Sequence, residues 1–223
     1  MKQNEIEKID LDVIHAMKTT VRQKTWVAVD AIKNIIQPYM TEKEAIKKAN
    51  EYLVSQGVKK FWHKTHIRFG ESTILSFNDP YKENVTLKEN DIFYIDIGPI
   101  WDGIEGDCGD TFVMGNNLEY LKIKTDIKNI LNEVRQFWLE NKDASGVKLS
   151  EVTQNLVEKN GYVLFPAYVK GHRLSEFSHQ KYADIGTFQA DFKPSADRWI
   201  LELQICHPSL KFGAFYEDLL SEF

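Results

Sequence analysis

Carboxylates placed inside apolar segments are the most informative feature of this sequence. Asp96 follows the apolar run 92–95, and Asp107 comes eleven residues later, beyond the turn-forming residues 101–103. Leaving an unpaired carboxylate buried in such a segment costs several kcal/mol, so a cation, a metal or a proton should neutralise it. The apolar runs and the turn between them predict a β-hairpin, which would bring Asp96 and Asp107 to one shared cation.

Three further polar residues extend this pattern towards the C-terminus. Glu202 lies inside the apolar segment 199–205, and Glu217 is flanked by apolar residues within 213–220. His172 follows a glycine just after a strand-like run. If the four carboxylates converge, two divalent cations would balance their charge. Oxygen ligands with one imidazole suit manganese, iron, cobalt or zinc, and two such cations roughly 3.5–4 Å apart can share carboxylates.

Each of these residues taken alone has a simpler interpretation. A single aspartate in a strand is more often an ion-pair partner, and a single histidine is more often a structural hydrogen-bonding group. Glu217 would face water if its strand lay at the edge of a sheet. The sequence has no Ser-His-Asp arrangement, glycine-rich phosphate loop or Cys-x-x-Cys pair, so it gives those chemistries no support.

Length and composition favour one globular domain in a reducing compartment. The chain has 223 residues, of which 43% are hydrophobic, so it can bury a substantial core. A formal charge of −5 without a block of Lys and Arg argues against a general nucleic-acid binder. Two cysteines make no disulfide framework, and the N-terminus lacks the apolar stretch of a signal peptide, so we expect a cytoplasmic protein. No apolar run is long enough to predict a membrane span.

The elements that must position these side chains can be traced from apolar spacing. Residues 9–36 have the three- and four-residue spacing of a long amphipathic helix. The segment 41–44 is a capping box, and it starts a second helix that is expected to run to about residue 55. Residues 58–80 are expected to be irregular strand and loop. The hairpin that carries the two aspartates comes after them.

The second half of the chain predicts a similar order of elements. Asn117 should cap a third helix, and a fourth is expected at about 149–159. Strands are predicted at three places: 162–169, 199–205 and 213–220. A long helix, a short helix and paired strands thus occur in 10–115 and again in 117–220. Two similar halves would place a site at their junction.

Read in order, these residues resemble metallopeptidase family M24, which includes methionine aminopeptidase, aminopeptidase P and prolidase and has the pita-bread fold. That family has five ligands in the order Asp, Asp, His, Glu, Glu, with the first two eleven residues apart in a D-x-G…G-D hairpin. The matching residues here are Asp96, Asp107, His172, Glu202 and Glu217. A second family histidine, seven residues after the first, matches His179. The resemblance covers essentially the whole chain.

The resemblance implies an α/β fold with a curved, mainly antiparallel sheet, helices on its outer face and pseudo-twofold halves. It implies one catalytic domain over residues 1–223, without the extra N-terminal domain of prolidase or creatinase. Two divalent metal ions (manganese, cobalt, iron or zinc) would be bound by the five ligands, with Asp96, Asp107 and Glu217 contacting both. Glu202 would handle the proton during hydrolysis, and His179 would hydrogen-bond the substrate carbonyl or the tetrahedral intermediate.

The sequence departs from the family pattern around the substrate. The family usually has a histidine 17 or 18 residues before the first aspartate, and residues 75–80 contain none. His63 or His66 could replace it from upstream. Where the family has G-H-G-I-G, this chain has Gly-His-Arg-Leu-Ser at 171–175. Where the family has Glu-Pro, it has Glu-Leu at 202–203. We therefore expect His66 and Arg173 to contact substrate and the specificity to be altered.

The expected function is metal-dependent hydrolysis of a small peptide or amide, similar to that of Xaa-Pro dipeptidases and aminopeptidases. We expect no nucleic acid or membrane partner, and a monomer or homodimer. Two alternatives stay open: a metal-independent, creatinase-like C–N hydrolase, and a non-catalytic binding protein on the same fold. Relatives of both kinds have lost ligands, whereas this chain retains all five, which favours the metallohydrolase.

Overall fold

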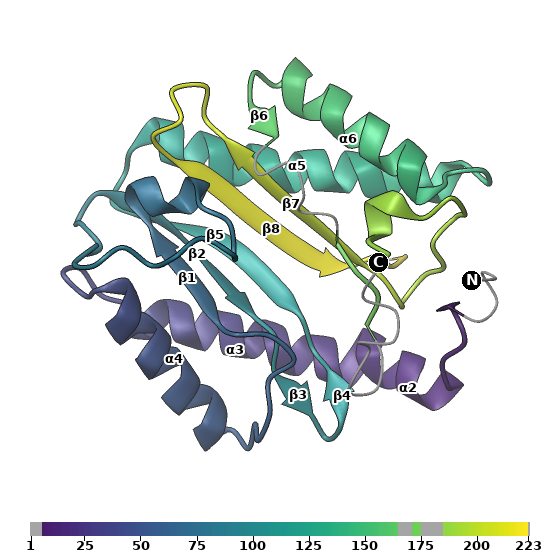
Figure 1. Cartoon of the computed structure of the whole chain (residues 1–223), viewed down its shortest axis with the longest axis horizontal. Coiled ribbons are helices and arrows are strands. Elements are labelled where there is room, and N and C mark those ends of the chain that lie inside the picture. The colour runs from purple at the N-terminus through teal and green to yellow at the C-terminus, as the bar shows by residue number, and fades with distance from the viewer. Residues whose placement is uncertain (1–5, 165–170, 175–184, 223) are drawn as a thin grey trace.

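A six-stranded sheet forms the centre of the protein (Figure 1). The computed structural model describes residues 6–164, 171–174 and 185–222. The strands lie in the order β1-β2-β5-β8-β7-β6, and neighbouring strands are antiparallel. Their bounds are β1 His66–Phe69, β2 Asp91–Ile97, β5 Cys108–Met114, β6 Val163–Leu164, β7 Ile200–Cys206 and β8 Gly213–Leu219. The predicted hairpin is β2 and β5, and its tip carries a small second sheet of β3 (Ile100–Trp101) and β4 (Ile104–Glu105).

The helices begin where local capping signals predict. The long helix expected over 9–36 consists of α2 (Leu11–Ala16), a π-helical stretch (Met17–Val21) and α3 (Arg22–Ile35). The capping box at Thr41 forms as predicted and starts α4 (Glu42–Ser55). Asn117 caps α5 (Leu118–Glu140) by accepting from two backbone N–H groups. The helix α6 (Gly146–Lys159) begins three residues earlier than predicted, because Ser145 caps it.

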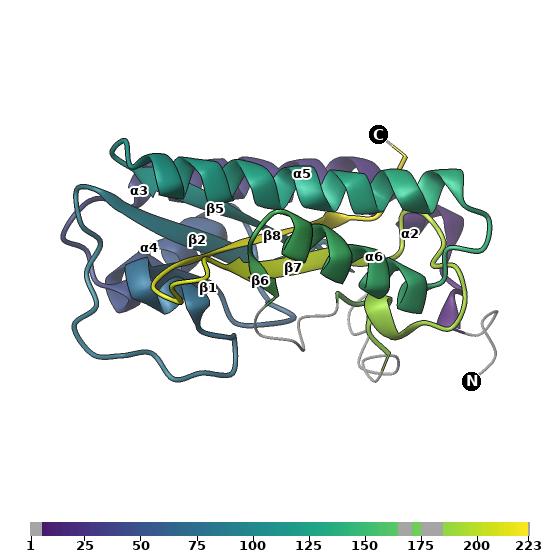
Figure 2. The same cartoon turned by 90° about the horizontal axis from the view of Figure 1, so that it is seen from above.

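The apolar face of the sheet packs against helices in two clusters. One cluster joins α3 and α4 to the first-half strands, and the other joins α5 and α6 to β7 and β8. Figure 2 shows α3 and α5 running along the same face of the sheet. Side chains alternate along a strand, so Ile95 and Ile97 on β2 point to the helices while Asp96 points away. On β7 the same alternation directs Leu201 and Leu203 to the helices and Glu202 to the opposite face.

The alternative interpretation, in which an edge strand would leave Glu217 in water, does not apply to this fold. Its strand β8 lies between β5 and β7, and Glu217 is only 2% exposed. Of the strand predicted at 162–169, the two residues of β6 are confirmed, and 165–169 lie outside the described residues. Within the part of the chain that the structure describes, no helix is long and apolar enough to cross a membrane.

Candidate metal centre

A row of paired residues crosses the sheet and collects four of the candidate side chains on one face. His66 on β1 pairs with Asp96, and Asp96 pairs with Gly109 on β5. The row continues from Gly109 to Glu217 on β8, and from Glu217 to Glu202 on β7. Directly opposite residues on neighbouring strands project to the same face. The register alone therefore places one imidazole and three carboxylates side by side on the face that the helices leave open.

Gly109 provides the space in the middle of this row. A Cβ atom at Gly109 would lie 3.0 Å from Oε1 of Glu217 and 2.4 Å from a ring carbon of Phe215. Because the glycine has no side chain, the Glu217 carboxylate and the Phe215 ring can lie directly over β5. This close approach is the physical reason that a glycine suits the central position of the row.

Asp107 immediately precedes β5 and contacts two imidazoles beside the row. Its Oδ1 lies 3.2 Å from Nε2 of His63, and its Oδ2 lies 2.7 Å from Nε2 of His172. The segment that carries His172 is fastened to β7: the N–H of Ile200 donates to the His172 carbonyl at 2.7 Å. The N–H of Gly171 donates to Oε2 of Glu202 at 3.2 Å. Asp107 and His172 therefore lie beside the row.

Three carboxylate oxygens in this centre are buried, and the imidazoles of His63 and His172 are the only donors that the described residues place near them. The three oxygens are Oδ1 of Asp96, Oδ2 of Asp107 and Oε1 of Glu217. Buried polar atoms are normally paired, so such a concentration requires an explanation. Two groups of described residues offer ligand atoms within 4.8 Å of one another: His63, His66 and Asp96 in one, and Asp107, His172 and Glu217 in the other. Both donor sets fit a divalent cation.

Burial and the neighbouring charges shift the pKa values of the carboxyl groups in this centre. Burial raises the pKa of Glu202 to about 7 and that of Asp96 to about 6, although a nearby imidazole opposes each shift. Burial and the charges of Asp107 and Asp96 raise the pKa of Glu217 well above its usual value. Burial would also raise the pKa of Asp107, but contacts with His172 and His63 outweigh it and bring that pKa to about 2. Cations would favour the ionised form of the three carboxyls whose pKa is raised.

The metal-free protein is expected to lose stability as the pH rises from 7 to 8.5. Burial disfavours protonated His63, but Asp96 and Asp107 outweigh it and raise its pKa to about 9. The pKa of Glu217 is also raised, so the folded state binds more protons than the unfolded state across this range. The free energy of unfolding must then fall with rising pH.

Melting temperatures of chelator-treated protein at pH 7 and 8.5 would measure this loss. The variant Glu217→Gln should show a smaller decrease, because one of the titrating groups is gone. A saturating divalent cation should flatten the dependence, because it replaces the bound protons. Equal melting temperatures at both pH values in chelator would contradict the prediction.

The remaining candidate residues lie in different surroundings. His66 is 8% exposed and borders a cavity, and its Nδ1 lies 3.3 Å from the Tyr81 hydroxyl. Burial and the charge of His63 lower the pKa of His66 to about 4, so its ring is neutral at pH 7. Arg173 is buried, and its guanidinium donates to the Lys8 carbonyl at 3.1 Å. His179 lies outside the residues that the structure describes.

His63 is the residue that spacing arguments missed as part of the centre itself. The sequence suggests it only as a replacement for a family histidine. Its Nε2 lies 3.3 Å from Oδ1 of Asp96, in addition to the contact with Asp107. It precedes the edge strand β1, and the pairing of β1 with β2, continued by backbone bonds between residues 60–62 and 98–100, brings it beside Asp96. No local sequence signal marks that pairing.

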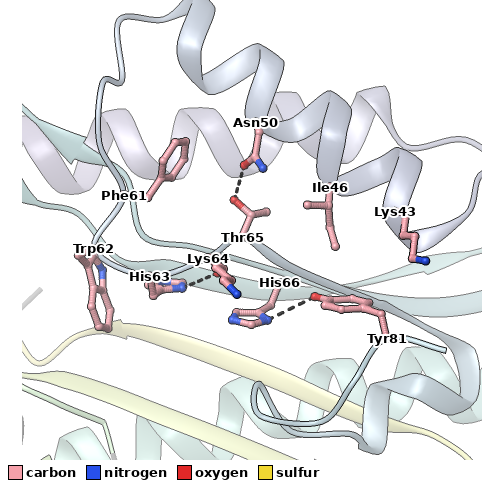
Figure 3. Close-up of a pocket in the computed structure, with 10 residues that line it drawn as sticks. All are labelled: Lys43, Ile46, Asn50, Phe61, Trp62, His63, Lys64, Thr65, His66 and Tyr81. Atoms are coloured by element: carbon pink, nitrogen blue, oxygen red, sulfur yellow. Dashed lines mark hydrogen bonds between the residues drawn. The ribbon is translucent and has the colours of Figure 1, made fainter. Parts of the chain in front are cut away.

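A cavity of about 590 Å³ opens beside the centre (Figure 3). His63 and His66 line the cavity on the side nearest the carboxylates. Much of the remaining wall consists of aromatic and aliphatic side chains: Ile46, Phe61, Trp62 and Tyr81. Lys43 and Lys64 add positive charge to the lining. The Trp62 ring lies 4.4 Å from the rings of both His63 and His172, measured between centroids. A molecule in this cavity would therefore lie against the imidazoles of the centre.

Comparisons with known proteins agree with this arrangement. The profile of metallopeptidase family M24 matches residues 18–218. An X-Pro aminopeptidase from Thermotoga maritima superimposes with a TM-score of 0.75 at 18% identity, over 96% of this chain and 62% of that one. An Xaa-Pro dipeptidase from Bacillus anthracis also superimposes with a TM-score of 0.75 at 18% identity, over 96% of this chain and 62% of that one. A methionine aminopeptidase from Thermotoga maritima has a TM-score of 0.69 at 17% identity, over 100% of this chain and 98% of that one.

These similarities establish the fold but not the activity. They confirm the expected pita-bread arrangement of a mainly antiparallel sheet with helices. The chain spans less than two thirds of the length of the X-Pro aminopeptidase and the Xaa-Pro dipeptidase. A comparison with curated protein sequences finds no significant match. Identities below 20% leave the activity to be argued from the residues of the site.

Proposed function

The chain belongs to metallopeptidase family M24, and from this premise we propose that it is a metal-dependent hydrolase of peptide or amide bonds. The observation that carries the proposal is the set of buried carboxylate oxygens whose only nearby donors among the described residues are two imidazoles. These oxygens lie on one face of the sheet together with the imidazole of His172. A creatinase-like or purely binding role gives no reason to retain such a costly cluster.

Five residues would hold two divalent cations in this proposal. Asp96, Asp107 and Glu217 would contact both, whereas His172 and Glu202 would each contact one. When bound, the cations would supply Lewis acidity and lower the pKa of water. Manganese, cobalt, iron and zinc all suit this mixture of carboxylates and imidazole.

The chain's own groups would then handle protons and orientation. Glu202 would accept the proton of the attacking water and pass it to the leaving amine, which is general acid–base catalysis. The N–H of Gly171 donates to Oε2 of Glu202 at 3.2 Å, and this hydrogen bond restricts the orientation of the carboxylate. His179 would donate to the substrate carbonyl as negative charge develops on it.

The cavity beside His63 and His66 would receive the substrate. Its volume of about 590 Å³ is typical of a pocket for a small molecule. The aromatic and aliphatic lining suits an apolar side chain or a proline ring next to the scissile bond. We therefore propose an activity similar to that of Xaa-Pro dipeptidases and aminopeptidases, with altered specificity and His66 as a substrate contact. Arg173, the second residue expected to contact substrate, is buried, donates to the Lys8 carbonyl and is not among the residues that line this cavity. A single catalytic domain, a cytoplasmic location and a monomeric or homodimeric state complete the proposal.

Metal content is the direct test of this function. Purified protein soaked with Mn²⁺ or Co²⁺ is expected to contain close to two ions per chain by elemental mass spectrometry. Removal of the metal by a chelator should abolish turnover of responsive peptides or amides in a substrate screen, and adding metal back should restore it. Protein that stays free of metal after both soaks would refute the proposal and leave the creatinase-like or binding alternative.

A further inference from the structure

His63 lies inside the carboxylate centre although the five-residue ligand pattern does not include it. Its Nε2 is 3.3 Å from Oδ1 of Asp96 and 3.2 Å from Oδ1 of Asp107. Apart from His63, the Asp96 oxygen that it approaches has no hydrogen-bond partner among the described residues. A ring nitrogen therefore points at the carboxylates from the β1 side of the sheet.

The other ring nitrogen of His63 is fixed in the way that a metal ligand requires. Nδ1 lies 2.7 Å from the carbonyl oxygen of Lys64. A carbonyl oxygen can only accept, so Nδ1 carries the hydrogen, and in the neutral ring Nε2 offers its lone pair. Histidines that bind metals commonly donate their second N–H to a backbone carbonyl or a carboxylate. This orientation makes Nε2 available to a cation at the carboxylates.

His172, a member of the five-residue pattern, has the same arrangement. Its Nδ1 lies 3.4 Å from the carbonyl oxygen of the next residue, Arg173, and its Nε2 lies 2.7 Å from Asp107 Oδ2. Both imidazoles thus turn Nδ1 to the carbonyl of the following residue and Nε2 to the carboxylates. The contacts of both ring nitrogens of His63 therefore match those expected of a metal ligand.

Packing holds the His63 ring in this orientation. A Cβ at Gly98 would lie 2.1 Å from Cδ2 of His63 and 2.5 Å from Nε1 of Trp62, so these rings lie directly against the glycine backbone. The Trp62 ring meets the His63 ring edge-on, with 4.4 Å between centroids. On another side, the His66 ring is nearly parallel at 5.8 Å. A ring held by three neighbours loses little further freedom when it binds a cation.

We propose that His63 is a ligand of the cation nearer to β1, which makes this position a mixed nitrogen and oxygen site. The inference rests on the proposed metal-dependent function and adds a sixth ligand to it. Imidazole suits cobalt, zinc, iron and nickel, whereas manganese and magnesium prefer oxygen. The second position already has His172. Both positions would then contain an imidazole, and the position nearer to β1 would favour cobalt or zinc over manganese.

Titration of the chelator-stripped full chain with Co²⁺ and with Mn²⁺ tests this ligand. In isothermal titration calorimetry, His63→Ala should weaken Co²⁺ binding at one of two positions by at least about 100-fold. Mn²⁺ binding should change by less than about 10-fold, because manganese gains less from imidazole. Free imidazole should restore much of the Co²⁺ affinity, since the cavity opens beside the vacated ring. His15→Ala is the matched control, because His15 is exposed on α2, and it should leave both titrations unchanged.

A second measurement separates ligation from an ion-pairing role. In the Co²⁺ protein, the N–H proton of each ligand imidazole is shifted by the paramagnetic ion in the NMR spectrum, and His63→Ala should remove one such exchangeable signal. His63→Phe retains a ring against Gly98 and Trp62 without a nitrogen, and it should bind Co²⁺ as weakly as His63→Ala. Unchanged Co²⁺ affinity in both variants would overturn the ligand inference while leaving the proposed function intact. Equal losses of Co²⁺ and Mn²⁺ that imidazole does not restore would overturn it as well. Wild-type protein that binds neither ion would instead refute the proposed function.

Discussion

Asp107→Asn is expected to reduce kcat/KM by at least about 1000-fold, which corresponds to roughly 4 kcal/mol of lost transition-state stabilisation. The Asp107 side chain is fully buried and contacts Nε2 of both His63 and His172. Its pKa of about 2 means that it is ionised at any working pH. The amide has a similar shape but carries no charge and cannot bridge two cations. Initial rates on a responsive peptide, together with metal content, measure the effect.

The same hairpin offers a matched control for this experiment. Asp102 lies in the turn between β3 and β4, where its side chain is 92% exposed. Asp102→Asn removes the same charge and should leave kcat/KM and metal content within about two-fold of wild type, because an exposed charge is largely screened by solvent. Thermal melts of both variants would verify that each is folded. A folded Asp107→Asn protein with two bound ions and normal turnover would remove the basis for the metal centre.

Arg22→Ala is expected to lower the free energy of unfolding by about 3 kcal/mol. The guanidinium of Arg22 on α3 forms two bonds with Asp218 on β8, from Nη2 to Oδ2 at 2.6 Å and from Nε to Oδ1 at 2.8 Å. Asp218 is 2% exposed and lies on the helix side of the sheet, next to Glu217 in the chain. Without Arg22, the Asp218 carboxylate would stay buried with hydrogen bonds from Trp26 and a backbone N–H and with Arg135 as a nearby cation. Breaking a buried pair in this way costs more than the pair itself contributes.

Urea denaturation would measure this loss, and an exposed ion pair between α3 and the turn from β3 to β4 provides the control. Lys24 lies 3.6 Å from Asp102, and their side chains are 47% and 92% exposed. Lys24→Ala should change the free energy of unfolding by less than about 1 kcal/mol, because exposed ion pairs contribute little. Similar denaturation midpoints for Arg22→Ala and Lys24→Ala would show that the buried pair is not what attaches α3 to β8.

The boundaries of the helices can be predicted from the sequence because their determinants are local. The capping box at 41–44 and the cap at Asn117 satisfy N–H groups only two or three residues away. Apolar spacing likewise indicates which face of each helix is buried. The predicted start of α6 is three residues late, because the cap Ser145 precedes the first clearly periodic residue. Such a difference is typical of boundaries inferred from periodicity.

The candidate ligands are also recognisable from the sequence, for an energetic reason. A carboxylate within an apolar strand is costly, so Asp96 and Glu202 stand out without any knowledge of the fold. The order of five such residues then produces the resemblance to the family, and the family profile and the solved structures agree with it. What these residues bind stays a proposal, and the metal measurements would decide it.

The tertiary structure alone decided which strands are neighbours and therefore how the centre is enclosed. The pair Gly109 and Glu217 joins residues more than a hundred positions apart, and it places β8 inside the sheet rather than at its edge. His63 enters the centre because β1 pairs with β2 and because Gly98 leaves room for its ring. Residue types and spacing determine which groups are costly to bury. Long-range pairing and close packing determine which of them meet, because no short segment of sequence encodes either.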